Sequence, residues 1–318
     1  MTGALPTEFA RIAQYFRPLA GPGALALGDD AAVFTPPQGR ELVIAADAMV
    51  AGVHFLPDDP ADLVARKLLR TNLSDLAAMG AAPLGYLLTV SVPRATPERW
   101  FAHFGAGLAA DQAEFGLHLL GGDTTSTPGP FSLSLTILGS VAPGTALRRN
   151  GAKPGDDIWV SGTIGDGALG LLAAKGELPD AGGFLSDRYH LPRPRLALGL
   201  ALVGVVHAAM DVSDGLVQDL SHICRASGLA AELRAADVPL SPAATAASRL
   251  ELCLTGGDDY ELLFAAAPAS AETIRAASRA TGIAVTRIGT FRAGPAHVTT
   301  IGVDGNALSL GSGGWSHL

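Results

Sequence analysis

Cysteine is nearly absent from this sequence, which has only Cys224 and Cys253 among its 318 residues. Two isolated cysteines exclude a disulfide framework and a cysteine-based zinc site. Long apolar runs are also missing, because none approaches the ~20 residues that a membrane-spanning helix needs. Residues 1–16 lack a basic segment followed by an apolar one, so we do not expect export. These absences predict a protein of the reducing cytoplasm, with no membrane association.

Positive charge is scarce as well. Lysine occurs only at positions 67, 153 and 175, and the formal net charge is −8. Binding to a nucleic-acid backbone needs clustered cations, so nucleic acid is excluded as a partner. Charged residues make up 16% of the chain and apolar residues 48%, which indicates a well-buried globular protein. At this length, two domains are the default expectation.

Helical and strand patterns occur in both halves of the chain, which predicts an α/β or α+β fold. We expect strands at 42–46, 85–92, 117–120, 131–141, 158–161, 260–265 and 283–290, and helices at 7–19, 61–79, 98–114, 168–175, 195–209, 215–226 and 270–281. The polar, turn-rich stretch 146–157 has the composition of a linker. We therefore predict an N-terminal domain at residues 1–145 and a C-terminal domain at residues 146–318.

An acidic turn recurs along the chain, usually beside an apolar run or a glycine. In Gly28-Asp29-Asp30 the flanking apolar runs predict that both carboxylates are held on a buried scaffold. One such turn is ordinary loop chemistry, but the repetition predicts a shared cluster of cations. The aspartates in these turns are Asp29, Asp30, Asp47, Asp75, Asp123, Asp211, Asp214, Asp258 and Asp259.

Gathered carboxylates require counter-ions, because two unit charges ~4 Å apart repel by ~4 kcal/mol at an effective dielectric of ~20. Oxygen ligands without a cysteine–histidine pairing favour Mg²⁺ or Ca²⁺, and the calcium-loop spacing is absent. Magnesium held by separate aspartates usually bridges to the phosphates of a substrate, which predicts phosphoryl transfer. Neither a Walker A motif nor the protein-kinase glycine loop is found, so the chain must use another kinase scaffold.

Glycine turns supply a second signal. Gly121-Gly122, residues 162–165 and Gly256-Gly257 can each bring main-chain N–H groups close to anionic oxygens. Gly165-Asp166-Gly167 precedes an expected helix, whose N-terminus can face a phosphate. Arg149 is the one obvious cation beside an expected site, and its guanidinium suits a bidentate phosphate contact.

Each of these residues also has a purely structural interpretation. Asp29-Asp30 or Asp75 taken singly is more often a cap or turn, and Ser213-Asp214-Gly215 can cap a helix. His54 alone is typical of a partly buried core or edge residue, and Trp315 of a packed aromatic. Only the complete set favours a functional site. Surface or packing positions are expected for His190, His207 and His222.

Eight motifs occur in order from residue 27 to the C-terminus. They are Leu27-Gly28-Asp29-Asp30-Ala31, Gly52-Val53-His54-Phe55, Asn72-Leu73-Ser74-Asp75-Leu76-Ala77-Ala78-Met79-Gly80, Gly121-Gly122-Asp123-Thr124-Thr125, Arg149-Asn150-Gly151-Ala152-Lys153-Pro154-Gly155-Asp156, Asp211-Val212-Ser213-Asp214-Gly215-Leu216, Gly256-Gly257-Asp258-Asp259-Tyr260-Glu261-Leu262 and Gly314-Trp315-Ser316-His317-Leu318. Together they resemble the thiamine-monophosphate kinase family. A single motif is uninformative, whereas the ordered series, which covers essentially the whole chain, is highly specific.

The resemblance implies the two-domain fold of the aminoimidazole-ribonucleotide synthetase superfamily, in which the N-terminal sheets of two subunits pair into a barrel and form a homodimer. It implies phosphorylation of thiamine monophosphate to thiamine diphosphate by ATP, with several Mg²⁺ ions. The family pattern implies metal ligands at Asp30, Asp47, Asp75, Asp123, Asp211 and Asp214. It implies ATP contacts at Gly121, Gly122, Arg149 and Ser213, and thiamine-phosphate contacts at His54, Asp258 and Trp315.

Two departures from the family pattern concern the metal and acceptor sites. The family usually has serine or threonine oxygens before the second aspartate, where this chain has Ala45 and Ala46. Either the main-chain carbonyls of these alanines replace those oxygens as ligands, or a metal site is weakened. The family's acidic residue after Gly256-Gly257 is commonly glutamate, and Asp258 is one methylene shorter. Since every principal aspartate remains, we expect an active enzyme.

The resemblance implies direct in-line transfer without a general base, because the acceptor phosphate is already a nucleophile at neutral pH. Three relatives in the superfamily are alternatives: aminoimidazole-ribonucleotide synthetase, selenophosphate synthetase and a hydrogenase-maturation protein. The first would lack the motifs at His54 and Trp315. The second needs a reactive residue near the N-terminus, yet no cysteine precedes Cys224, and the third would end in cysteine instead of Leu318. A non-catalytic sensor of thiamine phosphates is the remaining alternative, and the alanines at 45 and 46 favour it.

Overall fold

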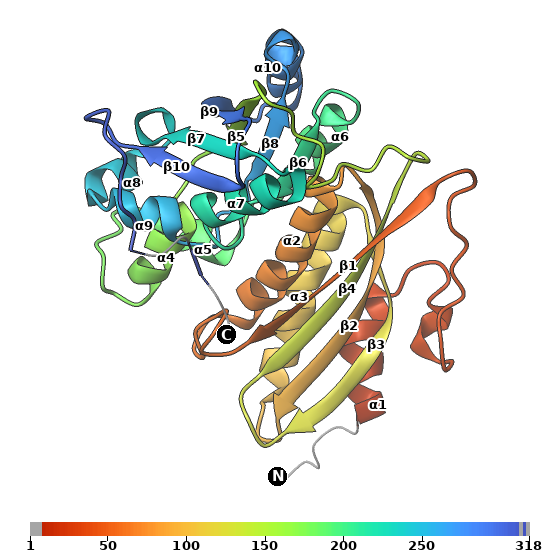
Figure 1. Cartoon of the computed structure of the whole chain (residues 1–318). Helices are drawn as coiled ribbons and strands as arrows, with labels where there is room; N and C mark the ends of the chain where they lie inside the picture. The colour runs from red at the N-terminus through yellow and green to blue at the C-terminus, as the bar shows by residue number, and fades with distance from the viewer. Residues whose placement is uncertain (1–7, 312–313, 316–318) are drawn as a thin grey trace. The chain divides into compact units, whose positions relative to one another are not determined.

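The computed structural model describes residues 8–311 and 314–315, and the chain divides into two compact units (Figure 1). Unit 1 is built from the chain up to Leu73 and from Ala82–Pro143. Unit 2 is built from Ser74–Ala81 and from Gly144 onwards. Both units contain helices and a β-sheet, which confirms the mixed fold class. The inclusion of Ser74–Ala81 in the second unit is a feature that the sequence did not predict.

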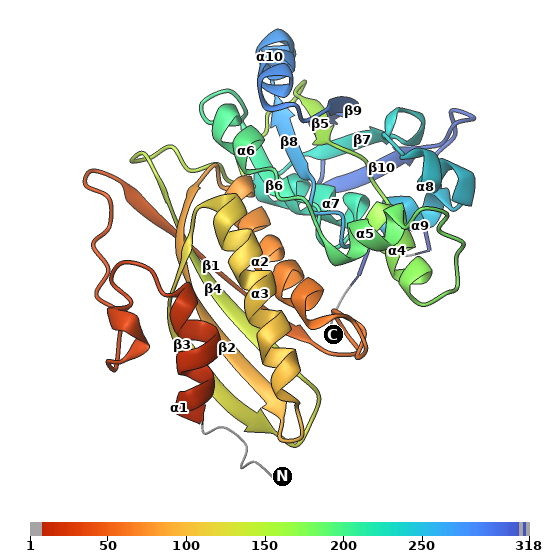
Figure 2. The same cartoon turned by 180° about the vertical axis from the view of Figure 1, so that it is seen from behind.

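Unit 1 contains a four-stranded sheet in the order β1-β4-β2-β3. Its strands are β1 (Glu41–Val50), β2 (Ala82–Pro93), β3 (His118–Thr127) and β4 (Ser132–Val141), and its helices are α1 (Glu8–Arg11), most of α2 (Ala61–Ala78) and α3 (Glu98–Phe115). Strand β4 is antiparallel to both β1 and β2, whereas β2 and β3 are parallel. Helices α2 and α3 lie behind the sheet in Figure 1 and in front of it in Figure 2.

Side chains alternate between the two faces of this sheet, as the pattern of 131–141 predicts. On β4, Leu133, Leu135 and Ile137 are fully buried. The opposite face is more open, because Ile44 is 61% exposed and Leu87 is 41% exposed. This exposed apolar surface does not follow from the alternation alone.

Helix α2 forms where the sequence predicts it. Pro60 precedes the first helical residue, Ala61, and the helix ends at Ala78 before the left-handed Gly80. Its leucines at 68, 69, 73 and 76 are all fully buried. Burial on this scale, at ~1.5–3 kcal/mol for each side chain, makes α2 a rigid support for the polar residues that it carries.

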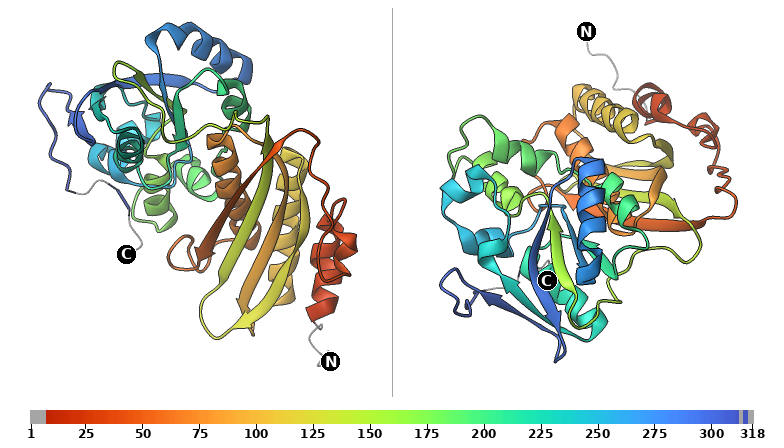
Figure 3. Two further views of the ribbon diagram at one scale, coloured as in Figure 1. Left: turned by 45° about the vertical axis from the view of Figure 1, so that its right-hand side comes forward. Right: turned by 90° about the horizontal axis from the view of Figure 1, so that it is seen from above.

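The helix expected at 7–19 is present over the described residues but is irregular, because α1 continues as a π-helical turn (Ile12–Phe16) and a 3-10 turn (Arg17–Leu19). Phe9 is 78% exposed and is not part of the core. These segments, in red, lie beside strand β3 in Figure 1 and in the left view of Figure 3. The apolar flanks of Asp29-Asp30 are not a buried scaffold either, because Leu25 and Val33 are largely exposed.

Unit 2 contains a six-stranded mixed sheet in the order β10-β7-β9-β5-β8-β6. Its strands are β5 (Asp157–Ser161), β6 (Ala208–Asp211), β7 (Ala230–Arg234), β8 (Leu262–Ala266), β9 (Val285–Arg292) and β10 (His297–Ile301). Its helices are α4 (Asp166–Ala174), α5 (Phe184–His190), α6 (Leu196–Leu202), α7 (Leu216–Ser227), α8 (Pro242–Ala247), α9 (Leu250–Thr255) and α10 (Ala271–Thr281).

Both faces of this second sheet are covered, which accounts for the fully buried strands β5 and β8. Ile158 and Val160 share one core with Leu220 and Ile223 of α7. Trp159 lies between them in β5 and faces the other side of the sheet. There it packs in a second core that includes residues of α6 and α10. The expected helix at 195–209 is too long, because residues 208–211 form β6 next to β8. In the part of the chain that the structure describes, none of the helices combines the length and hydropathy needed to span a bilayer.

Candidate active site

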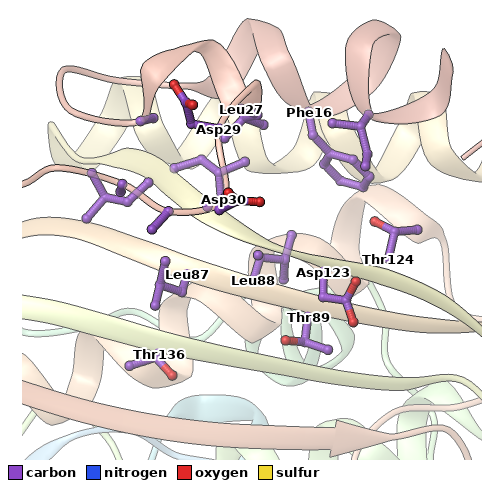
Figure 4. A pocket seen from close by; sticks show the side chains of 18 of the residues that line it. Phe16, Leu27, Asp29, Asp30, Leu87, Leu88, Thr89, Asp123, Thr124 and Thr136 are labelled. Carbon is purple, nitrogen blue, oxygen red and sulfur yellow. The ribbon is translucent and has the colours of Figure 1, made fainter. Parts of the chain in front are cut away.

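A cavity of about 580 Å³ in unit 1 brings two of the expected metal ligands together. Asp30 enters its wall from the segment before β1, and Asp123 enters from β3 (Figure 4). Asp29 and Thr124 also line the cavity, while Phe16 contributes an apolar wall. The cavity therefore combines carboxylates with apolar surface, which is suitable for a ligand that carries both an apolar part and an anionic group paired with cations.

The expected glycine loop at Gly121-Gly122 is instead part of a strand. Strand β3 continues past Leu120 to Thr127, and its register with β2 shifts by one residue near Leu87. A Cβ atom on Gly122 would lie 1.8 Å from the carbonyl oxygen of Leu88, so a side chain does not fit there. Both glycines line the cavity. They therefore bring the main chain to the cavity from a strand and not from a turn.

Asp47 lies on the opposite face of the same sheet from Asp123. Asp47 pairs with Leu135, whose side chain is fully buried on the face covered by α2 and α3, whereas Asp123 pairs with Thr89 of the open face. The two aspartates also lie on opposite edge strands, β1 and β3. Three strand spacings of about 4.8 Å separate these strands by about 14 Å. One chain therefore does not bring Asp47 and Asp123 to a single ion.

Strand β1 and helix α2 are joined at Asp47. The Asp47 N–H donates to Oδ1 of the buried Asn72, 3.2 Å away, and the Asn72 amide donates to the Leu68 carbonyl. Asp47 is within the strand, not at its end as expected. Ala45 and Ala46 precede it in β1, paired with Ile137 and Thr136 of β4.

In unit 2, the end of α2 meets the end of β6. The Ser74 hydroxyl donates to Oδ2 of Asp211 over 2.7 Å, and both residues are buried. Asp75, another expected ligand, follows Ser74 in the chain and is half-buried. The structure thus joins two of the motifs, which are more than 130 residues apart in sequence, through Ser74 and Asp211. The sequence did not predict the role of Ser74.

The loop between β6 and α7 is organised by a buried carboxylate. Oδ2 of Asp219 accepts the main-chain N–H groups of Ser213, Asp214 and Gly215 at 3.0, 3.0 and 3.2 Å. Burial and then the negative charge of Asp211 raise the pKa of Asp219 to about 8. This residue was not among the sequence candidates. Its place in the first turn of a helix after Ser-Asp-Gly is a capping signal that can identify it.

A histidine and an arginine complete this acidic group. Ligand atoms of Asp214, Asp219 and His222 lie within 4.8 Å of one another. Burial, together with the positive charges of Arg225 and Arg149, lowers the pKa of His222. The charge of Arg149 therefore acts on His222. The expectation that His222 is only a surface or packing residue misses this arrangement.

Two expected acceptor contacts adjoin the same loop. The Asp258 N–H donates to the carbonyl of Ser213, and the Trp315 N–H donates to the carbonyl of Asp214, each over 2.9 Å. Trp315 is 53% exposed, so its indole can stack against a ligand ring. Residues 316–318 of the last motif lie outside the described residues. The structure therefore brings four of the expected residues into one hydrogen-bonded neighbourhood.

Asp259, next to Asp258, supports the glycine turn before α4. Its two carboxylate oxygens accept the N–H groups of Gly165 and Gly167 at 2.7 and 3.0 Å. Burial raises the pKa of Asp259 to about 8. Asp258 itself has a φ of +70°, which is strained for a residue with a side chain. The segment therefore places a residue that supports the main chain directly after an expected acceptor contact.

Comparisons with known proteins give a consistent result. The family models described as AIR synthase related protein, N-terminal domain and C-terminal domain match residues 28–141 and 153–302. A thiamine-monophosphate kinase of Caulobacter vibrioides is 50% identical over 299 residues, which cover 91% of this chain and 85% of that protein.

Solved structures extend the comparison to the fold. The crystal structure of a thiamine-monophosphate kinase from Stenotrophomonas maltophilia K279a has a TM-score of 0.80 at 43% identity, covering 89% of this chain and 91% of the other. The structure of AaThiL complexed with AMPPCP and TMP has a TM-score of 0.77 at 27% identity, covering 92% and 91%.

Proposed function

This chain belongs to the thiamine-monophosphate kinase family of the AIR synthase related proteins, and from that membership we propose that it phosphorylates thiamine monophosphate to thiamine diphosphate with ATP. One structural observation supports this activity independently of family membership. Ser213 and Asp214, the residues of the expected nucleotide and metal site, are hydrogen-bonded to Asp258 and Trp315 of the expected acceptor site. A donor nucleotide and an acceptor phosphate bound by these residues would therefore be neighbours.

The reaction is a direct in-line transfer. A phosphate oxygen of thiamine monophosphate attacks the γ-phosphorus of ATP, the bond from that phosphorus to the β–γ bridging oxygen breaks, and ADP leaves with the electron pair. The acceptor oxygen is anionic at neutral pH, so the chain supplies no general base. The contribution of the protein is to hold two mutually repelling anions in line.

The expected metal ligands of unit 2 have the charge and the donor atoms that Mg²⁺ requires. Negative charge accumulates around Asp219, since the charges of Asp211 and Asp214 both add to burial in raising its pKa. The candidate ligands Asp75, Asp211 and Asp214 offer oxygen atoms, which is the donor type that Mg²⁺ prefers. When bound, Mg²⁺ supplies positive charge that offsets repulsion between these carboxylates and the phosphates.

The active form is a homodimer in which two chains share each site. Two observations support this: Asp47 and Asp123 lie on opposite faces of one sheet, and the open face exposes apolar side chains such as Leu42, Ile44 and Leu87. Burial of this face against a second copy removes apolar surface from water. Because Asp47 and Asp123 lie on opposite edge strands, pairing of the β1 edge of one protomer with the β3 edge of the other would bring the Asp30–Asp123 cavity of one chain beside the Asp47 site of its partner.

The activity is tested by steady-state ADP formation with and without thiamine monophosphate, together with chromatography of the thiamine phosphates. We expect ADP and thiamine diphosphate in equal amounts, and neither product without the acceptor or with excess EDTA. Binding of ATP and thiamine monophosphate without turnover would instead favour the sensor alternative, for which Ala45 and Ala46 are the supporting feature.

The shared site is tested by subunit complementation. Asp47→Asn and Asp123→Asn are each expected to be inactive alone. After the two variants are unfolded and refolded together, random pairing into symmetric dimers gives about a quarter of wild-type activity, because half of the dimers are mixed and each has one intact site. Inactive mixtures that nevertheless contain mixed dimers by mass spectrometry would show that the two aspartates act in the same chain.

A further inference from the structure

The loop that carries His54 is folded tightly against the end of β1. The carbonyl of Val50 accepts the N–H groups of Val53 and His54 at 3.1 and 3.0 Å, and Gly52 donates to the Phe55 carbonyl at 2.8 Å. Gly52 has a φ of +83°, which a glycine adopts without strain. The main chain around His54 is therefore closed on itself within the six residues from Val50 to Phe55.

The same loop determines which nitrogen of His54 carries the proton. The main-chain N–H of Val50 donates to Nδ1 of His54 over 3.0 Å. A main-chain N–H can only donate, so Nδ1 must present its lone pair and the ring proton must lie on Nε2. His54 is thus held as the Nε2–H tautomer, which is a hydrogen-bond donor of the kind that suits an anionic oxygen.

Lys67 supports this loop from helix α2. Its Nζ donates to the carbonyl oxygen of His54 over 3.1 Å, although the lysine is only 2% exposed. Burial of an ammonium group costs several kcal/mol before hydrogen bonds and nearby charges offset it. Packing alone therefore does not account for a lysine at this position.

We propose that Lys67 is a positioning residue for the phosphate monoester acceptor, acting through His54. By holding the His54 carbonyl, Lys67 keeps the main chain in the conformation in which Val50 meets Nδ1, and the ring then presents Nε2–H to a phosphate oxygen. The ammonium also adds a positive charge beside the loop that receives a dianion. The assignment rests on the proposed function, since it takes His54 as an acceptor contact.

Arg70 provides a matched control for Lys67. Both are cations with little exposure on α2, three residues apart, but Nε of Arg70 donates to Oδ2 of Asp111 over 2.8 Å instead of supporting the His54 loop. Lys67→Met and Arg70→Met both remove a buried cation from the same helix. Only the first removes the support of His54. The pair therefore separates positioning of the acceptor from general stability of α2.

The kinetic test compares KM and kcat for both substrates. For Lys67→Met we expect the KM for thiamine monophosphate to rise ~10-fold or more, as for loss of a hydrogen bond to a charged group. The KM for ATP and the kcat should stay within about twofold of wild type. Lys67→Arg, which keeps a donor, should recover most of the acceptor affinity. Arg70→Met should lower the unfolding midpoint and leave both KM values unchanged.

Equal increases in both KM values for Lys67→Met, or an acceptor KM that does not change, would overturn the proposal. A second measurement covers the case in which Lys67→Met folds poorly or the wild type has no kinase activity. Ring ¹⁵N shifts in histidine-labelled protein should identify His54 as the Nε2–H tautomer in the wild type and in Lys67→Arg. A protonated Nδ1 in the wild type contradicts the proposal directly. Absence of ADP formation by the wild type, by contrast, contradicts only the proposed function.

Discussion

The hydroxyl of Ser74 donates to Oδ2 of Asp211 over 2.7 Å, and this contact joins the end of α2 to the end of β6 inside unit 2. Ser74 is fully buried and Asp211 is 5% exposed, so little water competes for the bond. The hydroxyl fixes the orientation of a carboxylate that is expected to bind Mg²⁺. Groups that orient a metal ligand in this way affect both metal affinity and ligand geometry.

We predict that Ser74→Ala weakens the response to Mg²⁺. Loss of an orienting partner typically costs 10–100-fold in metal affinity, so the Mg²⁺ concentration at half-maximal ADP formation should rise ~10-fold or more. The rate at saturating Mg²⁺ should change less. Ser221→Ala is the control, because the Ser221 hydroxyl donates to the Gln218 carbonyl within α7. A similar Mg²⁺ shift in both variants would argue against an orienting role.

Asp219→Ala should destabilise the protein and weaken nucleotide binding. The substitution removes the acceptor of three main-chain N–H groups, from Ser213 to Gly215, and an unpaired buried donor costs ~1–3 kcal/mol. We expect the free energy of unfolding in urea to fall by at least ~2 kcal/mol. Asp237→Ala, in an exposed ion pair with Arg234, should change it by less than ~0.5 kcal/mol. Equal losses of unfolding free energy in the two variants would contradict the conclusion that Asp219 stabilises this loop.

Asp30→Asn and Asp75→Asn should abolish turnover without unfolding the chain. Each removes a negative charge from the expected metal site, and loss of one such electrostatic contact typically lowers the rate ~100-fold or more. Circular dichroism and the urea midpoint should stay close to wild type, as for the exposed control Asp304→Asn. Near-normal rates at saturating Mg²⁺ would count against the metal-assisted mechanism.

Gly122→Ala should be far more disruptive than Gly121→Ala. A Cβ at Gly122 would lie 1.8 Å from the Leu88 carbonyl oxygen, whereas a Cβ at Gly121 would lie 3.4 Å from the nearest atom, on Leu87. Forcing atoms into a packed site costs ~1–3 kcal/mol, so we expect a loss of that size at 122 and a loss below ~1 kcal/mol at 121. Denaturant unfolding measures both. If the two variants have the same stability, the close pairing of β3 with β2 at this point is wrong.

Stability should depend on pH through Asp259. Burial raises its pKa to about 8 from an ordinary value of 3.8, so the folded state holds the proton more tightly than the unfolded state. The contribution of this proton to stability is complete below pH ~4 and is lost as the pH rises towards ~8. The free energy of unfolding should therefore fall across this range, and Asp259→Asn should flatten the dependence. A steeper fall of the free energy of unfolding with pH in Asp259→Asn would contradict the predicted direction of this dependence.

Sequence patterns predicted correctly those helices and strands whose structure depends on residues close together in the chain. The helix expected at 61–79 from its apolar spacing is present as α2, and the strand expected at 131–141 from its alternation is present as β4. These patterns depend on residues a few positions apart, so no distant contact is needed to read them. The helix expected at 195–209 failed because pairing with β8 makes residues 208–211 a strand, and that pairing is non-local.

The sequence by itself determined the chemistry of this protein: the aspartates, the glycines and the aromatic and basic residues that suit a nucleotide and a phosphate acceptor. The tertiary structure decided on which side of a sheet each group lies, and separated Asp47 from Asp123. It also revealed the supporting residues, because Lys67 and Ser74 act on groups that only folding brings near. The reason is physical: side-chain type is local, whereas strand register and hydrogen bonds between distant segments depend on the packing of the whole unit.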